Sequence, residues 1–143
     1  PIAAELGADA IILADQQDTV AEVLRVTGGR GADLVVEASG AAPAIAASFG
    51  VVRRMGRISQ IGLTGRDEIK IPWDKAAWKV CNLYFNMSTG FTCWDRSIGL
   101  IASKKMDVRK IISHTARLTE WERMFDLIEK QEALKVIFTF QED

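Results

Sequence analysis

Residues able to perform chemistry are few in this sequence and lie far apart. The chain has one histidine, His114, and two cysteines, Cys81 and Cys93, which form no Cys-x-x-Cys pair. Because zinc sites need three or four clustered ligands, we expect no metal site within the chain, and we expect the cysteines to be free, buried thiols. Glu37 has no second carboxylate at a spacing typical of acid and base catalysis, so we expect it to orient backbone at a strand end.

Small residues follow an apolar run near the middle of the first half of the chain. Leu34-Val35-Val36 lies between glycines, and Ser39-Gly40 comes shortly after it. β-branched residues between glycines predict a central parallel strand that is buried on both faces. Ligands of open α/β sheets lie beyond the carboxyl ends of such strands, where a lack of side-chain bulk lets backbone approach a cofactor. Ser39 and Gly40 are therefore candidate cofactor contacts, although the same dipeptide also suits an ordinary turn.

Strand and helix patterns alternate along the rest of the chain. Apolar runs predict further strands at residues 10–14, 57–61, 82–87 and 135–140, and helical periodicity predicts helices at 1–6, 19–27, 41–49, 73–80, 94–103 and after Thr119. Residues 107–118 are expected to be short and irregular. The strands at 57–61 and 82–87 also end in small residues, at Gly62 and at Ser88-Thr89-Gly90. This order predicts an α/β fold with a parallel sheet.

Start signals predict where two of these helices begin, and apolar stripes predict the buried faces of two. Thr19 with Glu22, and Thr119 with Glu122, have the spacing of a capping box. The helix at 94–103 is expected to bury Ile98, Ile101 and Ala102, and the helix after Thr119 is expected to place in the core the stripe Trp121, Met124, Phe125 and Ile128.

Composition excludes several classes of partner. The 143 residues are enough for one domain with a single core, and 18 basic against 19 acidic residues give a net charge of −1. No overall field therefore favours nucleic acid or anionic lipid. No run approaches the ~20 apolar residues that cross a bilayer, and no secretory signal opens the sequence. We expect a soluble, cytoplasmic protein with no nucleic-acid or membrane partner.

Six short segments, taken in order, resemble the second half of the medium-chain dehydrogenases. They are Glu5-Leu6-Gly7-Ala8-Asp9, Thr27-Gly28-Gly29-Arg30-Gly31-Ala32-Asp33, Val36-Glu37-Ala38-Ser39-Gly40, Gly56-Arg57-Ile58, Ile61-Gly62 and Ala133-Leu134-Lys135-Val136. Ile71-Pro72-Trp73-Asp74-Lys75-Ala76-Ala77-Trp78 and Met87-Ser88-Thr89 are similar to the zinc-dependent branch that acts on polyols and threonine. The resemblance covers nearly the whole chain.

The resemblance implies a partial Rossmann-like domain from a larger enzyme. Members of this family carry the catalytic zinc in an amino-terminal domain and hold the dinucleotide at a Gly-x-Gly-x-x-Gly turn, and neither is present in this sequence. We therefore expect a carboxy-terminal fragment of a single domain that lacks the first two strands. Residues 1–90 or so would belong to the NAD(P)-binding domain, and about 91–143 would return to the missing catalytic domain. The parent would be a zinc-dependent alcohol or polyol dehydrogenase that uses NAD or NADP, with zinc in the missing domain only and weak or no cofactor binding by the fragment.

The resemblance also implies roles for individual residues. Ser39 and Gly40 would lie along the cofactor ribose, and the nicotinamide would lie beside a wall made by Ile61, Gly62 and Leu63. The carboxamide would be contacted by Asn86, Met87 and Ser88. Lys135 matches a basic position that faces the pyrophosphate, although a solvated charge before a strand is an equal alternative. His114 matches a family histidine, for which we expect a structural hydrogen bond and no catalytic role.

Loss of the first two strands would leave apolar strands bare. Right-handed crossovers place the helices that follow on one face of the sheet, so the other face loses its cover. We expect the chain to pair residues 10–14 directly with residues 34–38, or to cover the bare face by self-association. The strand at Asn82 to Met87 is a candidate dimer edge. The alternative function is a catalytically inactive module that acts only in assembly or protein interaction.

Overall fold

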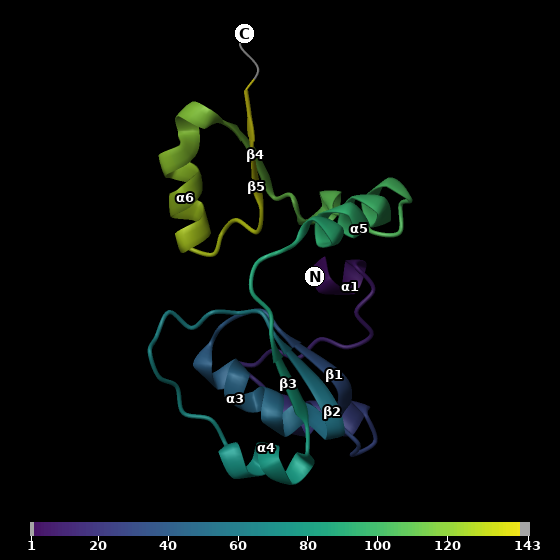
Figure 1. Cartoon of the computed structure of the whole chain (residues 1–143). Helices are drawn as coiled ribbons and strands as arrows, with labels where there is room; N and C mark the ends of the chain where they lie inside the picture. Colours follow the sequence, from purple (N-terminus) through teal and green to yellow (C-terminus); the bar gives the residue numbers. More distant parts are fainter. Residues whose placement is uncertain (1, 141–143) are drawn as a thin grey trace. The chain divides into compact units, whose positions relative to one another are not determined.

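A computed structural model describes residues 2–140 of the chain (Figure 1). The chain divides into two compact units: Ile12–Ser88 forms one, and Pro1–Ile11 together with Thr89–Asp143 forms the other. We call the first the sheet unit and the second the terminal unit, and describe each by itself.

Three parallel strands form the centre of the sheet unit. They are β1 (Ala32–Glu37), β2 (Val52–Gln60) and β3 (Asn82–Phe85), in the order β1-β2-β3. Val35 pairs with Ile58, and Ile58 pairs with Leu83, so the strands run level across the sheet. The strand predicted at 57–61 is the second half of β2, which begins earlier, at Val52. The predicted α/β class with a parallel sheet is confirmed.

Helices cover one face of this sheet. The helix α3 (Ala42–Val51) packs against β1 and β2, α4 (Trp73–Lys79) packs against β2 and α3, and α2 (Thr19–Val26) packs against α3 (Figure 1). The buried core lies beneath α3 and consists of Ile45, Phe49, Val52 and Ile58. Small residues dominate α3, as the sequence indicates, and they let this helix approach its neighbours: a Cβ added at Gly50 would collide with the Val20 side chain of α2.

Residues 10–14 do not form the predicted strand. The amide N–H of Leu13 donates to Gln17 Oε1 (2.9 Å), and Leu13 O accepts from the N–H of Gln16 and of Gln17. This local turn uses the backbone groups that a sheet ladder would need. The predicted pairing of residues 10–14 with residues 34–38 is therefore wrong for this chain.

As a consequence, β1 is an edge strand and is not buried on both faces. Val35 packs against the core, but Leu34 and Val36 point to the other face and are 49% and 57% exposed. Neither a neighbouring strand nor a helix layer of the sheet unit covers them. The sequence prediction of a doubly buried central strand is wrong for this reason.

Both predicted capping boxes are displaced. Asp18, not Thr19, caps α2, because its carboxylate accepts from the N–H groups of Val20 and Ala21. In the terminal unit, Glu120 Oε2 accepts from the Arg117 N–H (3.1 Å) ahead of a short 3-10 turn, η2 (Leu118–Glu120). The helix α6 (Trp121–Glu129) follows that turn directly, so the Thr119 and Glu122 pair makes no box.

The described residues of the terminal unit form a short two-stranded sheet and three α-helices. Its helices are α1 (Ile2–Glu5), α5 (Phe91–Ala102) and α6, with a 3-10 turn η1 (Arg109–Ile111). The strands β4 (His114–Arg117) and β5 (Val136–Thr139) pair in parallel. β5 was predicted, but β4 falls in a segment expected to be irregular, because its four mixed residues carry no β pattern.

Neither predicted apolar helix face of the terminal unit is buried as a whole. On α5, Ile98 and Ile101 are 60% and 42% exposed and Ala102 is exposed as well. On α6 only Met124 is buried; Trp121 and Phe125 are about half exposed and meet edge to face, with ring centroids 6.0 Å apart. The two stripes are amphipathic in sequence but lack a covering layer among residues 2–140. No helix in this part of the chain is long and apolar enough to cross a membrane.

Candidate functional site

The carboxyl ends of β1, β2 and β3 meet at one edge of the sheet unit. The register pairs Glu37 with Gln60 and Gln60 with Phe85, so the three strands end at the same level. The loops that follow begin with shared backbone hydrogen bonds: Glu37 O accepts from Ile61 N (2.8 Å), and Gln60 O accepts from Asn86 N (2.9 Å). We call this edge the strand-end rim. Eight of the nine predicted cofactor contacts belong to its loops, namely Ser39, Gly40, Ile61, Gly62, Leu63, Asn86, Met87 and Ser88.

A buried carboxylate organises the first two loops of the rim. Glu37 is 4% exposed, and its side chain accepts hydrogen bonds from the Ser39 N–H (3.0 Å), the Ser39 hydroxyl and the Gly40 N–H (3.2 Å). Gln60, also buried, donates from Nε2 to Glu37 Oε2 (2.7 Å) and to Gly62 O (2.9 Å). The expectation that Glu37 orients backbone at the strand end is thereby confirmed.

These contacts also set the charge state of Glu37. Burial alone would raise the pKa of this carboxyl, but the hydrogen bonds from Ser39, Gly40 and Gln60 outweigh it and hold the pKa below its usual value. Glu37 is thus an ionised, fully hydrogen-bonded group that faces inward. It positions the loops and has no geometry suited to proton transfer.

Gln60 is a rim residue that the sequence analysis missed. It links two loops through one side-chain amide, from a strand position whose side chain is 6% exposed. Its position in the sequence could have identified it. Gln60 is a polar residue two positions after Ile58, so both side chains lie on the covered face of β2. A buried amide needs partners, and only Glu37 of β1 and the Gly62 carbonyl supply them here.

Gly40 and Gly62 serve a close contact between the two loops. A Cβ at Gly40 would collide with the Leu63 backbone, and one at Gly62 would collide with the Gly40 backbone. Gly40 also has a φ of +70°, which other residues rarely adopt. Glycine at these two positions therefore allows the backbones of the two loops to come into contact. The small residues at the strand ends had been expected to make room for a cofactor.

The outer surface of the rim is apolar and accessible. Ile61, Leu63 and Met87 are 49%, 70% and 74% exposed. Asn86 is held in place because its Nδ2 donates to Ser59 Oγ (3.0 Å) and to Tyr84 O (3.3 Å). Beside the end of β1 a cavity of about 510 Å³ is lined by Val36, Ser39, Ala41 and Ala47, among others. The rim thus offers apolar side chains, fixed amides and an adjoining hollow.

Lys135 and His114 belong to the terminal unit. Ser113 connects them: its Oγ accepts from the Lys135 N–H (3.2 Å) and lies 3.0 Å from His114 Nδ1. The Lys135 carbonyl in turn accepts from the N–H groups of Ser113 and His114. His114 therefore has the structural hydrogen bond expected of it, and Lys135 is exposed.

The described residues do not form a zinc site. Within residues 2–140 no three side chains of His, Cys, Asp or Glu lie close enough together to hold a metal ion. Cys81 is half-buried beside the core, and Cys93 is exposed on α5, so the expectation of a buried thiol is wrong for Cys93. Zinc chemistry is therefore not assigned to any residue of this part of the chain.

The chain is similar to known dehydrogenases over nearly its whole length. Residues 1–130 match the family model described as zinc-binding dehydrogenase. The chain is 31% identical over 137 residues to a sorbitol dehydrogenase of Halalkalibacterium halodurans, which covers 96% of the chain and 40% of the relative. It is 32% identical over 139 residues to an L-threonine 3-dehydrogenase of Bacillus velezensis, with 95% and 40% covered.

The fold comparison agrees with the sequence comparison. An alcohol dehydrogenase from Thermus sp. ATN1 superposes with a TM-score of 0.90 at 31% identity, covering 97% of this chain and 40% of that one. The chain thus spans about 40% of the length of the curated relatives it matches. The predicted likeness to polyol and threonine dehydrogenases is confirmed, and the chain belongs to the zinc-binding dehydrogenase family.

Proposed function

We propose that this chain contributes part of the nicotinamide-cofactor site of an oxidoreductase that transfers hydride between a secondary alcohol and NAD or NADP. The observation that supports the proposal is the strand-end rim, where three parallel strands end level and Glu37 holds the loops after β1 and β2 together. Ligands of open α/β sheets bind outside the carboxyl ends of the strands. Family membership adds the dehydrogenase chemistry.

The rim has groups suited to the nicotinamide half of the cofactor. Ile61 and Leu63 provide an exposed apolar surface against which a flat ring can lie. Asn86, held by Ser59 and the Tyr84 carbonyl, would contact the carboxamide together with Met87 and Ser88. Ser39 and Gly40 would line the ribose.

When bound, the oxidised cofactor would accept the hydride, and the residues of this chain would orient its nicotinamide ring. A rigid loop pair favours this role because the hydride donor and acceptor carbons must be held in near-contact geometry. The substrate in this proposal is a polyol or another small secondary alcohol, in keeping with relatives named sorbitol dehydrogenase and L-threonine 3-dehydrogenase. Polarisation of the substrate oxygen is not assigned to this chain.

We also propose that the chain forms homo-oligomers through β3 or the bare sheet face. β3 is the outer strand on its side of the sheet, and Tyr84, Phe85 and Met87 are 53%, 79% and 74% exposed. An unpaired strand edge with exposed aromatic residues is a ready pairing surface for a second copy.

The cofactor role is tested by titrating NADH into the 143-residue chain and into the variant Leu63→Asp while recording nicotinamide fluorescence. We expect weak but saturable binding, lowered about tenfold further by L63D because the new carboxylate replaces apolar surface and repels the phosphates. Leu63 is largely exposed, so the fold should persist.

Leu118→Asp is the matched control, since Leu118 is an exposed leucine of η2. It should bind NADH as the unchanged chain does. No binding by the unchanged chain up to millimolar NADH, or equal weakening by both variants, would contradict the proposal and favour an inactive module that acts only in assembly.

A further inference from the structure

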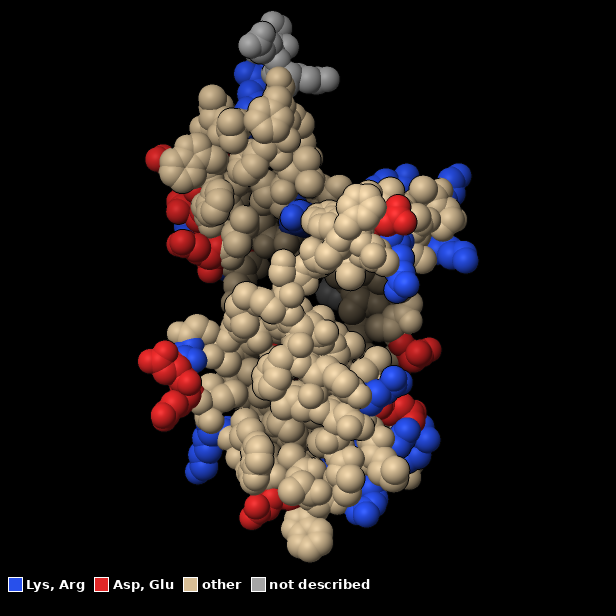
Figure 2. All heavy atoms as spheres, in the orientation of Figure 1, with Lys and Arg blue, Asp and Glu red and all other residues tan. Residues whose placement is uncertain are grey.

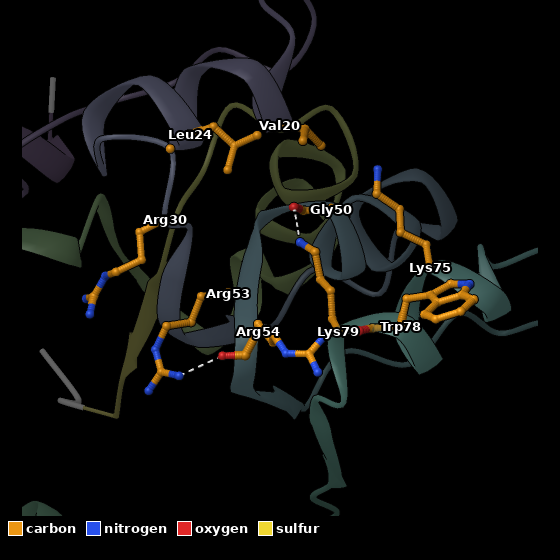
Figure 3. A pocket seen from close by; sticks show the side chains of 10 residues that line it. Val20, Leu24, Arg30, Gly50, Arg53, Arg54, Lys75, Trp78 and Lys79 are labelled. Carbon is orange, nitrogen blue, oxygen red and sulfur yellow. Dashed lines mark hydrogen bonds between the residues drawn. The ribbon is translucent and has the colours of Figure 1, made fainter.

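A second cavity lies at the opposite, amino-terminal end of the sheet unit. It has a volume of about 700 Å³ and is lined by residues from α2, the turn before β1, the end of α3, the start of β2 and α4 (Figure 3). Its lining residues are Val20, Leu24, Gly29, Arg30, Gly50, Arg53, Arg54, Lys75, Trp78 and Lys79. A volume of this size is typical of small-molecule sites.

Five of these ten residues are cationic, and none is acidic. Arg30 and Arg53 share one carboxylate: both guanidinium groups pair with Asp33, just outside the lining. Arg54 donates from Nη1 to the Trp78 carbonyl (3.0 Å), and within residues 2–140 it forms no ion pair. The chain as a whole carries a net charge of −1, so this positive charge is local and is not a property of the composition.

Lys75 and Lys79 add two further positive charges without a carboxylate partner in the described part of the chain. Lys79 Nζ donates to Gly50 O (2.6 Å) and to Val52 O, at the carboxyl-terminal end of α3, where a cation is favoured by the helix dipole (Figure 3). Burial and repulsion by Lys75 lower the pKa of Lys79 from its usual value. Lys79 thus has a structural task, whereas the exposed Lys75 side chain forms no hydrogen bond or ion pair with residues 2–140.

The basic cavity is separate from the strand-end rim. It lies at the amino-terminal ends of β1 and β2, and the six residues of β1 at ~3.3 Å each put the rim about 20 Å away. In the view of Figure 2, basic side chains gather over these amino-terminal ends. A cofactor seated on the rim would leave the cavity open to another ligand.

We propose that this cavity binds a small organic anion with two or more negative charges, such as a phosphorylated compound. Arg54, Lys75 and Lys79 provide uncompensated positive charge, and an ionised phosphate group is the ligand that suits clustered guanidinium and ammonium groups. Val20, Leu24 and Trp78 give the cavity an apolar side that accommodates a carbon skeleton or a ring. The cavity volume of about 700 Å³ and the net charge of −1 favour a small molecule over nucleic acid.

The test uses pyrophosphate as the charged probe and follows its binding to the 143-residue chain by calorimetry at low and moderate salt. We expect saturable binding that weakens about tenfold in the variant Lys75→Gln, because one charge-assisted contact is lost. Arg54→Gln should have an effect of similar size. Lys75 is exposed, so its substitution should leave the melting temperature unchanged, which circular dichroism checks.

Arg66→Gln is the matched control, because it changes the net charge by the same amount as Lys75→Gln does. Arg66 is exposed and lies beside the start of α3, outside the lining of the basic cavity. It should weaken pyrophosphate binding less than twofold. Absence of saturable binding at 10 mM probe, or equal weakening by K75Q and R66Q, would overturn the proposal. Tighter binding of a DNA 20-mer than of pyrophosphate through Lys75 would also overturn it, in favour of nucleic acid.

Leu63→Asp provides a further arm that separates this site from the proposed cofactor site. It should leave pyrophosphate affinity within twofold, since the rim and the cavity lie at opposite ends of the strands. Pyrophosphate binding that Leu63→Asp weakens as much as Lys75→Gln does would overturn the assignment of a separate site.

Discussion

At the scale of single residues, Glu37 holds the rim together. Its carboxylate accepts hydrogen bonds from N–H and O–H groups of Ser39, Gly40 and Gln60. Its backbone carbonyl accepts from the N–H of Ile61, the first residue of the next loop. An acid in this position has a positioning role, because both carboxylate oxygens accept hydrogen bonds from Ser39, Gly40 or Gln60. Loop geometry at the rim therefore depends on the ionised form.

Glu37→Gln should lower the free energy of unfolding by about 1–3 kcal/mol at pH 7, since the amide group would face N–H donors it cannot accept from. The pKa of Glu37 is lowered on folding, so its ionised form adds stability above the ordinary value near 4.5. That contribution is lost as pH falls through the lowered folded-state pKa. The gap between wild type and E37Q should therefore narrow below about pH 4.5, as measured by urea denaturation across pH.

The matched control for this prediction is Glu68→Gln, which removes an exposed carboxylate of the loop after β2. It should change stability by less than about 0.5 kcal/mol at any pH, as surface substitutions usually do. A gap between E37Q and wild type that stays constant down to pH 3 would contradict the assigned role of the ionised carboxylate.

At the scale of elements, the edge strands decide what the sheet unit can contact. β1 and β3 form the two edges of the three-stranded sheet, and β3 is only four residues long. Short edge strands bind weakly by themselves, so pairing through β3 depends on the exposed aromatic side chains beside it.

Tyr84→Lys should shift the association of the chain toward monomer, because a charged edge residue opposes strand pairing. Sedimentation velocity from 5 to 200 μM measures the change, and we expect the dimer dissociation constant to rise about tenfold or more. Leu118→Lys introduces the same residue at an exposed site of the terminal unit and should leave association unchanged. A wild-type chain that is monomeric at every concentration, or a Y84K chain that still dimerises equally well, would refute the β3 edge.

At the scale of the whole molecule, much apolar surface is left uncovered. Leu34 and Val36 of β1 and the stripe of α5 are apolar in pattern but exposed. Exposure of apolar surface to water costs a free energy of about 25 cal/mol for each Å². The uncovered surface therefore favours self-association of the chain. The chain spans about 40% of the relatives it matches, and in a longer protein further residues can cover these faces.

The double variant Leu34→Thr and Val36→Thr should reduce the fluorescence of a hydrophobic dye and raise the concentration at which the chain aggregates. Both side chains are already half exposed, so the free energy of unfolding should change by less than about 1 kcal/mol. Val35→Thr on the covered face should instead cost about 1–3 kcal/mol with unchanged dye binding, because it buries a hydroxyl in the core. Equal dye fluorescence in wild type and double variant would contradict the bare-face assignment.

Elements with strong local signals could be predicted from the amino-acid sequence. Helix α3 was predicted from its run of small residues, the strand ends from their glycines and serines, and the family from short segments in the right order. These features are local because periodicity and turn residues act within a few positions along the chain. The common edge for Ser39, Gly62 and Ser88 followed from parallel topology alone.

Which of these features are buried, and which groups meet, depends on how the elements pack in three dimensions. β1 is an edge strand because Leu13 uses its backbone in a local turn, a competition that the apolar run at residues 10–14 does not reveal. Gln60 joins Glu37, and Arg54 joins Lys75 and Lys79 around one cavity, because strand register and helix packing bring together residues about 20 positions apart in sequence. Burial and charge clustering depend on such long-range neighbours, which no local pattern specifies.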